Sequence, residues 1–241
     1  LFTAPQSSDG EVITTGGLDA RLAEAIDAAQ ETVDVAAYDF DLAPVADALV
    51  RADARGVRVR FVSDSDYADE LGPETLRAAG IPVVFDDREP FMHNKFVVID
   101  GAVVWTGSWN LTENGTYRNN NNVLVFTSTP LADNYTTEFE EMFVDRAFGA
   151  TSPEAIPHPR IDLNGTQVTT VFEAEGDVRT QILALLAEAD ASVYVMAFVF
   201  TDDALAEALI DRHRAGVDVV AVIEARNAEG PGSDYDRLRQ A

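Results

Sequence analysis

The feature that most constrains the fold of this chain is an internal repeat. A shift of 160 residues superposes Val33–Phe40 on Val193–Phe200, and Gly56–Val59 on Gly216–Val219. No gap is needed from about Gly16 to Val62. We interpret this match as a duplication in which both copies fold as the same supersecondary unit.

Each copy is predicted to form a βαβ unit preceded by a helix. The expected elements, in chain order, are helices at 18–29 and 178–189, strands at 33–38 and 193–198, helices at 45–55 and 203–215, and strands at 57–62 and 217–223. The helices show apolar residues at helical spacing, and a glycine follows the second helix of each copy. The strands are continuously apolar, which indicates a sheet with helices on both faces. The expected fold class is therefore α/β, with a mixed sheet flanked by helices.

The first copy continues beyond the repeated part. A helix is expected at 74–79, a strand at 83–85, a hairpin of strands 96–99 and 103–106 turning at Asp100-Gly101, a strand at 123–126 and a helix at 131–143. We expect residues 1–148 to form the first repeat and 149–165, with three prolines, to form a linker. Residues 166–241 then hold the opening of a second repeat, so the chain is expected to be a fragment whose second copy is truncated.

Lys95 is the only lysine of the chain, and it follows His93 by two positions. Residues two apart on an extended segment project from the same face. A neutral imidazole can act as a nucleophile or move a proton near neutral pH, and an ammonium group beside it can neutralise an oxyanion. A cation retained where composition disfavours it therefore predicts an anion-binding site.

The residues after Lys95 extend this site into the pattern H-x-K-x4-D-x6-G-S-x-N. Its further members are Asp100, Gly107, Ser108 and Asn110. Gly107 permits a tight hairpin end, and Ser108 and Asn110 supply neutral hydrogen-bond donors. Together these groups could hold phosphate oxygens with His93 behind the phosphorus. No set of metal ligands accompanies them, so the chemistry is expected to rest on side chains, with no metal and no cofactor.

The pattern resembles the HKD signature of the phospholipase D superfamily, whose fold has two similar α/β halves with one signature each. The resemblance implies a metal-independent phosphodiesterase. The signature histidine of one half attacks phosphorus to form a phosphohistidine, the histidine of the other half protonates the leaving oxygen, and water hydrolyses the intermediate. It further implies that His93, Lys95 and Asp100 are catalytic, with Asp100 supporting the site, and that Lys95, Ser108 and Asn110 bind the substrate phosphate.

The chain departs from the family pattern in two ways. Members often carry an acidic residue shortly after the signature, which hydrogen-bonds the histidine, whereas this chain has Asn121 there. A neutral amide stabilises an imidazolium less, so His93 is either the nucleophile or the acid partner. The second signature is also absent. We expect a second half-site from the missing C-terminal region or from a homodimer.

The acidic composition bears on the substrate and the cellular setting. Seventeen basic against 42 acidic residues give a net charge of −25, which repels nucleic acid and anionic lipid except at high salt. We interpret the acidic, lysine-poor composition as that of a halophile. The expected substrate is nucleic acid or phospholipid, with nucleic acid favoured because no apolar membrane-docking or membrane-spanning segment is visible. The rival hypothesis is a non-catalytic binding or cell-surface module that kept the fold.

Smaller signals complete the sequence prediction. N-x-T acceptors at Asn114, Asn134 and Asn164 lean towards a secreted or surface protein, and the start at Leu1 is expected to reflect a removed N-terminal segment. Asp39 lies at the end of the first strand, where doubly wound sheets bind ligands, but its repeat mate is Val199. We therefore assign Asp39 no role.

The remaining aromatic and histidine residues are assigned structural positions. Tyr38 and Phe40, which flank Asp39, and their repeat mates Phe198 and Phe200 are expected in the core. His158 and His213 are expected to be exposed.

Overall fold

The chain divides into two compact units, Leu1–Glu175 and Gly176–Ala241, which are described separately below. The structure is a computed structural model, and it describes residues 1–3, 5, 15–153, 156–173 and 176–241.

The first unit is built on a six-stranded mixed sheet with the order β3-β2-β1-β4-β5-β6. The strands are β1 (Thr32–Ala37), β2 (Arg58–Ser63), β3 (Val83–Phe85), β4 (Lys95–Ile99), β5 (Val103–Gly107) and β6 (Val123–Thr127). β1, β2 and β3 run parallel, whereas β4 is antiparallel to β1, and β5 and β6 continue that antiparallel half. The predicted mixed sheet is confirmed.

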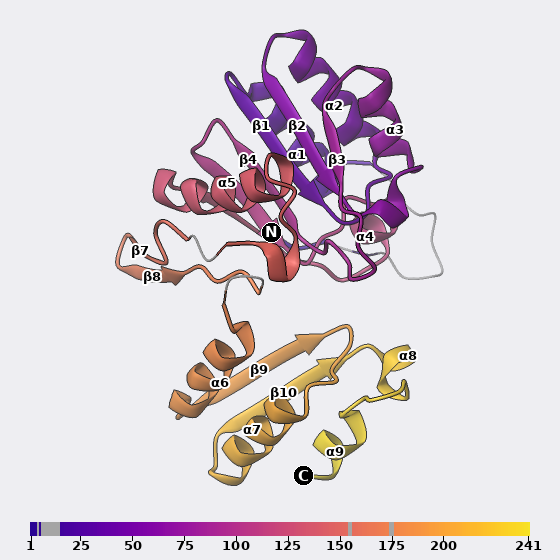
Figure 1. Cartoon of the computed structure of the whole chain (residues 1–241). Coiled ribbons are helices and arrows are strands. Elements are labelled where there is room, and N and C mark those ends of the chain that lie inside the picture. The colour runs from indigo at the N-terminus through magenta and orange to yellow at the C-terminus, as the bar shows by residue number, and fades with distance from the viewer. Residues whose placement is uncertain (4, 6–14, 154–155, 174–175) are drawn as a thin grey trace. The chain divides into compact units, whose positions relative to one another are not determined.

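Helices cover both faces of this sheet (Figure 1). They are α1 (Leu18–Ala28), α2 (Ala43–Ala54), α3 (Leu71–Ala78), the short α4 (Glu113–Tyr117) and α5 (Thr129–Phe143). Because neighbouring strand residues face opposite ways, Val35 packs in the core formed with α1 and α2, while Ala36 packs in a second core formed with Phe139 and Met142 of α5. This arrangement confirms the predicted flanking helices, although α4 was not predicted.

The hairpin between β4 and β5 turns where the sequence predicts. Asp100 and Gly101 have φ angles of 52° and 55°. Two consecutive positive φ values are typical of the tight turn that matches the twist of antiparallel strands.

A buried ion pair fixes α5 to the sheet. Arg60 donates from Nε to Asp34 Oδ1 at 2.7 Å and from Nη2 to Asp34 Oδ2 at 2.9 Å, and Nη2 also lies 2.7 Å from Glu140 Oε1. The guanidinium lies over the rings of Phe139 and Phe143, 4.9 and 5.1 Å from their centroids. Each charged group of this cluster therefore has an opposite charge beside it, which is the condition under which a buried ion pair is tolerated.

The end of the first unit differs from the predicted domain boundaries. The stretch 149–165 begins with a 3₁₀ turn, η2 (Gly149–Thr151), and continues into β7 (Arg160–Leu163), which pairs with β8 (Thr166–Thr169). Residues 154–155 of this stretch lie outside the described residues. The boundary between the compact units falls after Glu175, beyond the predicted linker, because the hairpin belongs to the first unit.

The second unit repeats the opening of the first. Its elements are α6 (Val178–Glu188), β9 (Ser192–Ala197), α7 (Asp203–Arg214), β10 (Asp218–Ile223), α8 (Ala225–Ala228) and α9 (Tyr235–Gln240). The first four follow α1, β1, α2 and β2 by 160 residues at both ends, and β9 and β10 pair in parallel as β1 and β2 do. The common origin of the two copies stays a prediction.

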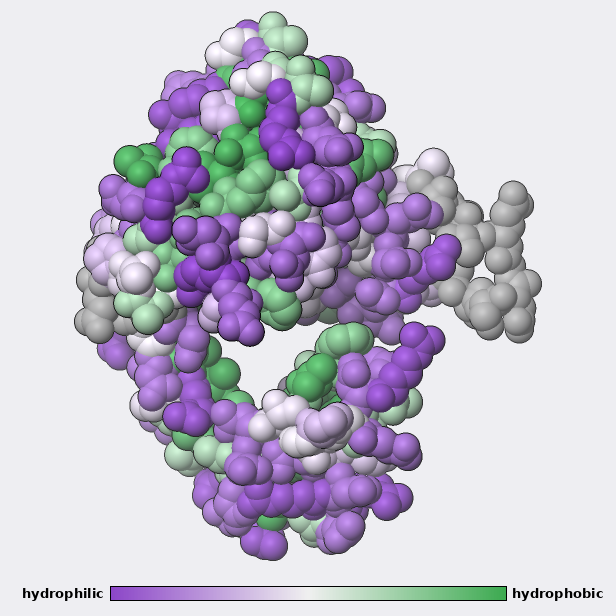
Figure 2. Space-filling model, turned by 45° about the vertical axis from the view of Figure 1, so that its right-hand side comes forward, coloured by the Kyte–Doolittle hydropathy of each residue, from purple (hydrophilic) through white to green (hydrophobic). Residues whose placement is uncertain are grey.

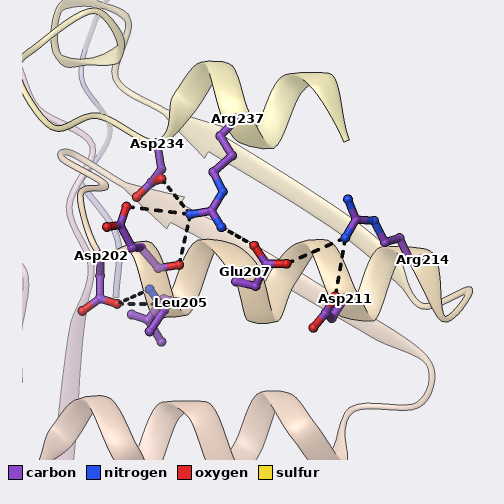
Figure 3. A network of polar contacts seen from close by, with 9 residues as sticks. Asp202, Leu205, Glu207, Asp211, Arg214, Asp234 and Arg237 are labelled. Atoms are coloured by element: carbon purple, nitrogen blue, oxygen red, sulfur yellow. Dashed lines mark hydrogen bonds and ion pairs between the residues drawn. The ribbon is translucent and has the colours of Figure 1, made fainter.

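Ion pairs tie α9 to α7 in this unit (Figure 3). Arg237 of α9 contacts both Glu207 of α7 and its own neighbour Asp234, and Glu207 also lies 3.8 Å from Arg214. Asp202 caps the start of α7 by accepting from the amide of Leu205 at 3.0 Å. The contact between Arg237 and Glu207 holds the last helix against α7 of the βαβ unit.

The surface is mainly hydrophilic, as the many charged residues of the sequence lead one to expect. Hydrophilic side chains dominate the face drawn in Figure 2. Within the described residues, no helix is both long and apolar enough to cross a membrane.

Candidate active site

The predicted site lies at one edge of the first sheet. Ala37, the last residue of β1, pairs with Lys95, the first residue of β4, because the two strands are antiparallel. β5 runs antiparallel to β4 and ends at Gly107, at this same edge. The residues before β4 and those after β1 and β5 therefore meet there.

His93 and Lys95 are brought together around the ring of Tyr38. The His93 and Tyr38 rings contact edge to face with centroids 4.5 Å apart, and Lys95 Nζ lies 5.1 Å from the Tyr38 centroid. Lys95 Nζ also donates a hydrogen bond to the backbone carbonyl of His93 at 2.8 Å. Cation–π contact and this hydrogen bond hold the ammonium close to the imidazole.

Tyr38 is a site residue that the sequence prediction assigned to the core. Its hydroxyl hydrogen-bonds that of Tyr67 at 3.0 Å, which fixes the ring. Phe40, two residues on, is fully buried as predicted, whereas Phe198, the repeat mate of Tyr38, was wrongly predicted in the core and is 71% exposed in the second unit. The available signal was the position of Tyr38 directly after a strand whose carboxyl end lies at the ligand-binding edge of such sheets.

The surroundings of His93 and Lys95 lower the pKa of both side chains. They favour a neutral imidazole beside an ammonium group that loses its proton more readily than usual. Burial and the charge of Lys95 lower the pKa of His93, against the opposing effect of Asp64. Burial also lowers the pKa of Lys95 to about 8, against the effect of Asp39. The apolar surroundings of the lysine include a cavity of about 20 Å³ lined by Trp105, Trp109 and Leu111.

Two carboxyl groups, those of Asp39 and Glu70, lie close to each other near the end of β1, and Asp39 interacts electrostatically with Lys95. Burial and the neighbouring Glu70 carboxyl raise the pKa of Asp39 to about 7, and Lys95 opposes that shift. Glu70 is held by the Phe40 amide, which donates to its Oε2 at 3.1 Å. Asp39, to which the sequence prediction gave no role, is therefore an electrostatic neighbour of Lys95.

Ser108 and Asn121 form a second part of the site. The Ser108 hydroxyl donates to Asn121 Oδ1 at 2.9 Å, and the Asn121 amide nitrogen donates to the Gly115 carbonyl at 2.9 Å. Within the described residues, Asn121 thus supports Ser108 rather than the His93 ring. Gly107 is required here because a Cβ would lie 2.2 Å from the carbonyl oxygen of Asn122.

Asn110 follows in the same loop after β5. Its side chain is half-buried, and its Oδ1 atom is buried without a hydrogen-bond partner in the described part of the chain. A buried acceptor of this kind is costly unless a ligand or water satisfies it.

Asp100 is not brought to this edge, and its predicted place among the catalytic residues needs correction. It follows Ile99, at the other end of β4 from Lys95, and five strand residues span about 16 Å. Its carboxylate accepts from the amides of Gln30, Glu31 and Thr32 at 3.0, 2.7 and 2.9 Å. Asp100 therefore ties the hairpin turn to the loop before β1, and these hydrogen bonds lower its pKa.

Thr3 was missed by the sequence prediction because it is remote in the chain. Its hydroxyl accepts from the Asn121 amide at 2.7 Å and donates to the Asn119 carbonyl at 2.7 Å. The segment 1–3 thereby positions the loop that holds Ser108.

The chain has two further histidines, one in each compact unit. Both are exposed, His158 beside Asp133 and His213 on α7. Among the described residues, no three or more histidine, aspartate or glutamate side chains are arranged to hold a metal ion.

Comparisons with known proteins show the family to which the first unit belongs. The family model described as cardiolipin synthase, PLD-like domain, matches residues 22–143, just over half of the chain. The mitochondrial cardiolipin hydrolase of Xenopus tropicalis is 37% identical over 119 residues, covering 48% of this chain and 56% of the relative. A phospholipase D of Rickettsia conorii is 35% identical over 116 residues, covering 47% of this chain and 58% of the relative. The match thus spans little more than half the length of these relatives, which are phospholipase D-like hydrolases.

A solved structure extends the likeness of fold. The phosphatidylserine synthase of Haemophilus influenzae Rd KW20 superposes with a TM-score of 0.65 at 15% identity, covering 87% of this chain and 60% of that chain. At this identity the likeness concerns the fold alone.

Proposed function

The chain belongs to the family of cardiolipin synthase, PLD-like domains, and from this membership we propose that it is a metal-independent phosphodiesterase acting on nucleic acid or phospholipid. The observation that carries the proposal is the placement of His93 and Lys95 against one Tyr38 ring. A nucleophile and a cation that both contact one aromatic ring can engage the phosphorus and an oxygen of the same phosphate.

His93 acts as the nucleophile in this proposal. Attack on phosphorus requires the neutral imidazole, and burial together with Lys95 lowers the pKa of His93, which favours that form. A general acid would need the opposite shift. The environment of His93 therefore supports the nucleophile over the acid partner.

Lys95 neutralises most of the negative charge of the bound phosphate, and Ser108 and Asn110 assist it by hydrogen bonding. Ser108 donates to Asn121 in the free protein, so donation to a phosphate oxygen requires that bond to break. Lys95 Nζ donates a hydrogen bond to the backbone carbonyl of His93. Within the described residues, no carboxylate lies within ion-pairing distance of Lys95 to compete with a phosphate. The ammonium is therefore the strongest anion-binding group of the site.

The reaction proceeds by formation and hydrolysis of a phosphohistidine. An imidazole nitrogen of His93 bonds to phosphorus as the P–O bond to the leaving group breaks, and the leaving oxygen takes a proton. Water then cleaves the P–N bond and returns the imidazole. The proton for the leaving oxygen comes from a second half-site, supplied by a second copy or by further chain.

Hydrolysis of single-stranded DNA and of phosphatidylcholine in molar salt tests the proposal. We expect His93→Ala to reduce turnover at least about 10³-fold, because nucleophile removal leaves only binding contributions. The matched control is His213→Ala, which removes an exposed histidine of the second unit. Equal turnover by wild type and His93→Ala would contradict the role of His93 and favour a non-catalytic binding module.

Quenching with alkaline denaturant during turnover distinguishes the nucleophile from the acid, because the P–N bond of a phosphohistidine is stable in alkali and hydrolyses in acid. We expect a phosphorylated histidine that maps to His93 by mass spectrometry. A phosphohistidine found only at another position would make His93 the acid partner.

A further inference from the structure

An exposed aromatic ring lies beside the proposed catalytic pair. Phe91 packs against Tyr38 with ring centroids 5.3 Å apart, yet 56% of its surface is exposed. A phenylalanine whose only role is structural is usually buried. The exposed part of Phe91 is therefore available to a ligand.

The position of Phe91 relative to His93 limits what that ligand is. Tyr38 contacts both rings, with centroid distances of 4.5 Å to His93 and 5.3 Å to Phe91, so the two rings lie at most 9.8 Å apart. The plane of the Tyr38 ring is inclined by 68° to that of His93 and by 59° to that of Phe91. The rings therefore do not form a closed stack, and Tyr38 and Phe91 make an open corner. A flat group attached next to a phosphate held by His93 and Lys95 can reach this corner.

The supporting ring is rigid and neutral. The Tyr38 hydroxyl is engaged by Tyr67, whose ring also packs on Tyr38 at 4.7 Å. Burial and this hydrogen bond raise the pKa of Tyr38. The corner thus offers preformed aromatic faces, which cost little conformational entropy on binding.

Charge around Phe91 argues for a ligand bound by stacking rather than by ion pairing. Asp86, Asp87 and Glu89 precede it in the same loop, with Arg88 as the only basic residue among them. Asp64, which accepts from the Met92 amide at 2.8 Å, adds a further carboxylate. These groups repel an anionic bilayer surface and the phosphates of a strand alike, whereas stacking of a neutral base on Phe91 needs no counter-charge.

Resting on the proposed phosphodiesterase function, we propose that Phe91 and Tyr38 form a stacking subsite for an unpaired nucleobase next to the scissile phosphate. The bases of a duplex have both faces covered, so the subsite selects single strands. Stacking is tolerant of base identity, since every base has a π face. Phe91 is then a specificity-determining residue of the site.

The proposed subsite predicts an unusual dependence of strand affinity on salt concentration. Nucleic-acid binding usually weakens steeply with salt because phosphate contacts release counterions. Here the protein has a net charge of −25, and its repulsion of the strand is screened at high salt while stacking persists. We expect affinity for a short single strand to hold or to rise between 0.1 and about 2 M salt.

Fluorescence anisotropy with a labelled pentathymidylate and an abasic strand of equal length tests the subsite. We expect wild type to bind the base-containing strand about fivefold or more tightly than the abasic strand. Phe91→Ala should reduce this preference below about twofold, and Phe91→Trp should retain it, because both aromatic rings stack on a base. Val144→Ala, which trims a side chain that is 60% exposed at the end of α5, is the matched control and should behave as wild type.

Several results would overturn the subsite. They are equal affinity of wild type for the two strands, no binding of either strand, an unchanged preference in Phe91→Ala, or Phe91-dependent binding to phosphatidylglycerol vesicles in place of the base preference. Hydrolysis of the abasic strand separates the two proposals. If that hydrolysis depends on His93 while the base preference is missing, the phosphodiesterase function stands and only the subsite fails.

Discussion

The Ser108 hydroxyl donates to Asn121 Oδ1 at 2.9 Å, so the serine of the proposed phosphate site is held by the asparagine that occupies the place of an acid. The amide of Asn122 donates to the same hydroxyl at 3.1 Å. Thr3 in turn holds Asn121 through its backbone amide. A residue at the start of the chain therefore positions part of the site more than one hundred residues away.

Removal of the Thr3 hydroxyl should weaken substrate binding. Thr3→Val loses an acceptor for the Asn121 amide and a donor to the Asn119 carbonyl, each worth about 1 kcal/mol. We expect KM to rise about fivefold with little change in kcat, and Thr3→Ser to restore KM. Steady-state kinetics on one oligonucleotide measures both. If the serine variant is as impaired as the valine variant, the hydroxyl is not the cause.

The pH profile of kcat/KM should be bell-shaped. Activity should fall below the lowered pKa of His93, where the imidazole becomes protonated, and should fall above about pH 8, where Lys95 loses its proton. Lys95→Arg should retain part of the activity and move the alkaline limb upward by several pH units, because a guanidinium stays protonated. An alkaline limb that remains near pH 8 in Lys95→Arg would assign it to another group.

Asp100 should contribute to stability rather than to chemistry. Asp100→Asn keeps a residue that tolerates the positive φ and one acceptor oxygen, but loses the charge that accepts three amides. We expect the free energy of unfolding at pH 7 to fall by about 1 kcal/mol, with specific activity of the folded protein within about twofold of wild type.

The same substitution predicts a pH dependence of stability. Because the pKa of Asp100 is lowered in the folded state, its contribution is present above the ordinary aspartate pKa of about 3.9 and is lost as pH falls through the folded value. Urea unfolding at several pH values should therefore show the two proteins converging below pH 4. A constant difference across that range would show that charge is not involved.

Arg60 and Asp34 should be strongly coupled. Arg60→Met leaves the Asp34 carboxylate, which is 2% exposed, without its bidentate partner and should cost about 3–5 kcal/mol. The double variant Asp34→Leu/Arg60→Met should recover most of that loss, since uncharged side chains can replace a buried pair. Chemical denaturation of the single and double variants measures the coupling. Additive losses would indicate that the two side chains act independently.

The second unit gives a natural comparison for this pair. At the repeat positions of Asp34 and Arg60 it carries Tyr194 and Val220, which lie beside each other in β9 and β10. The same βαβ arrangement therefore forms without the ion pair. The pair is specific to the unit in which α5 covers that face.

Much of the fold could be predicted because it is encoded by local pattern. Apolar spacing placed α1, β1, α2 and β2 within one or two residues of their bounds. The β7–β8 hairpin could not be predicted in the same way, because its short strands follow a proline-rich stretch and lack a strong alternating pattern.

In the candidate site too, relationships between residues close in the sequence could be predicted, and relationships between distant residues could not. His93 and Lys95 could be paired from the sequence, since residues two apart on an extended segment share a face. Asp100 was assigned to the site by its place in the signature pattern, although the predicted strand at 96–99 and the turn at Asp100-Gly101 already imply that it lies at the other end of the strand from Lys95. Tyr38 and Phe91 meet across more than fifty residues, and only the packing of β1 beside β4 brings them together.

The sequence by itself determined the repeated βαβ units, the hairpin turn at Asp100-Gly101 and the proximity of the histidine to the lysine. These depend on backbone propensity and side-chain periodicity, which act over a few residues. Only the tertiary structure decided that Asp100 binds the loop before β1, that Asn121 supports Ser108, and that an exposed Phe91 adjoins the pair. Those relationships depend on strand order and register, because register decides which distant residues share an edge of the sheet.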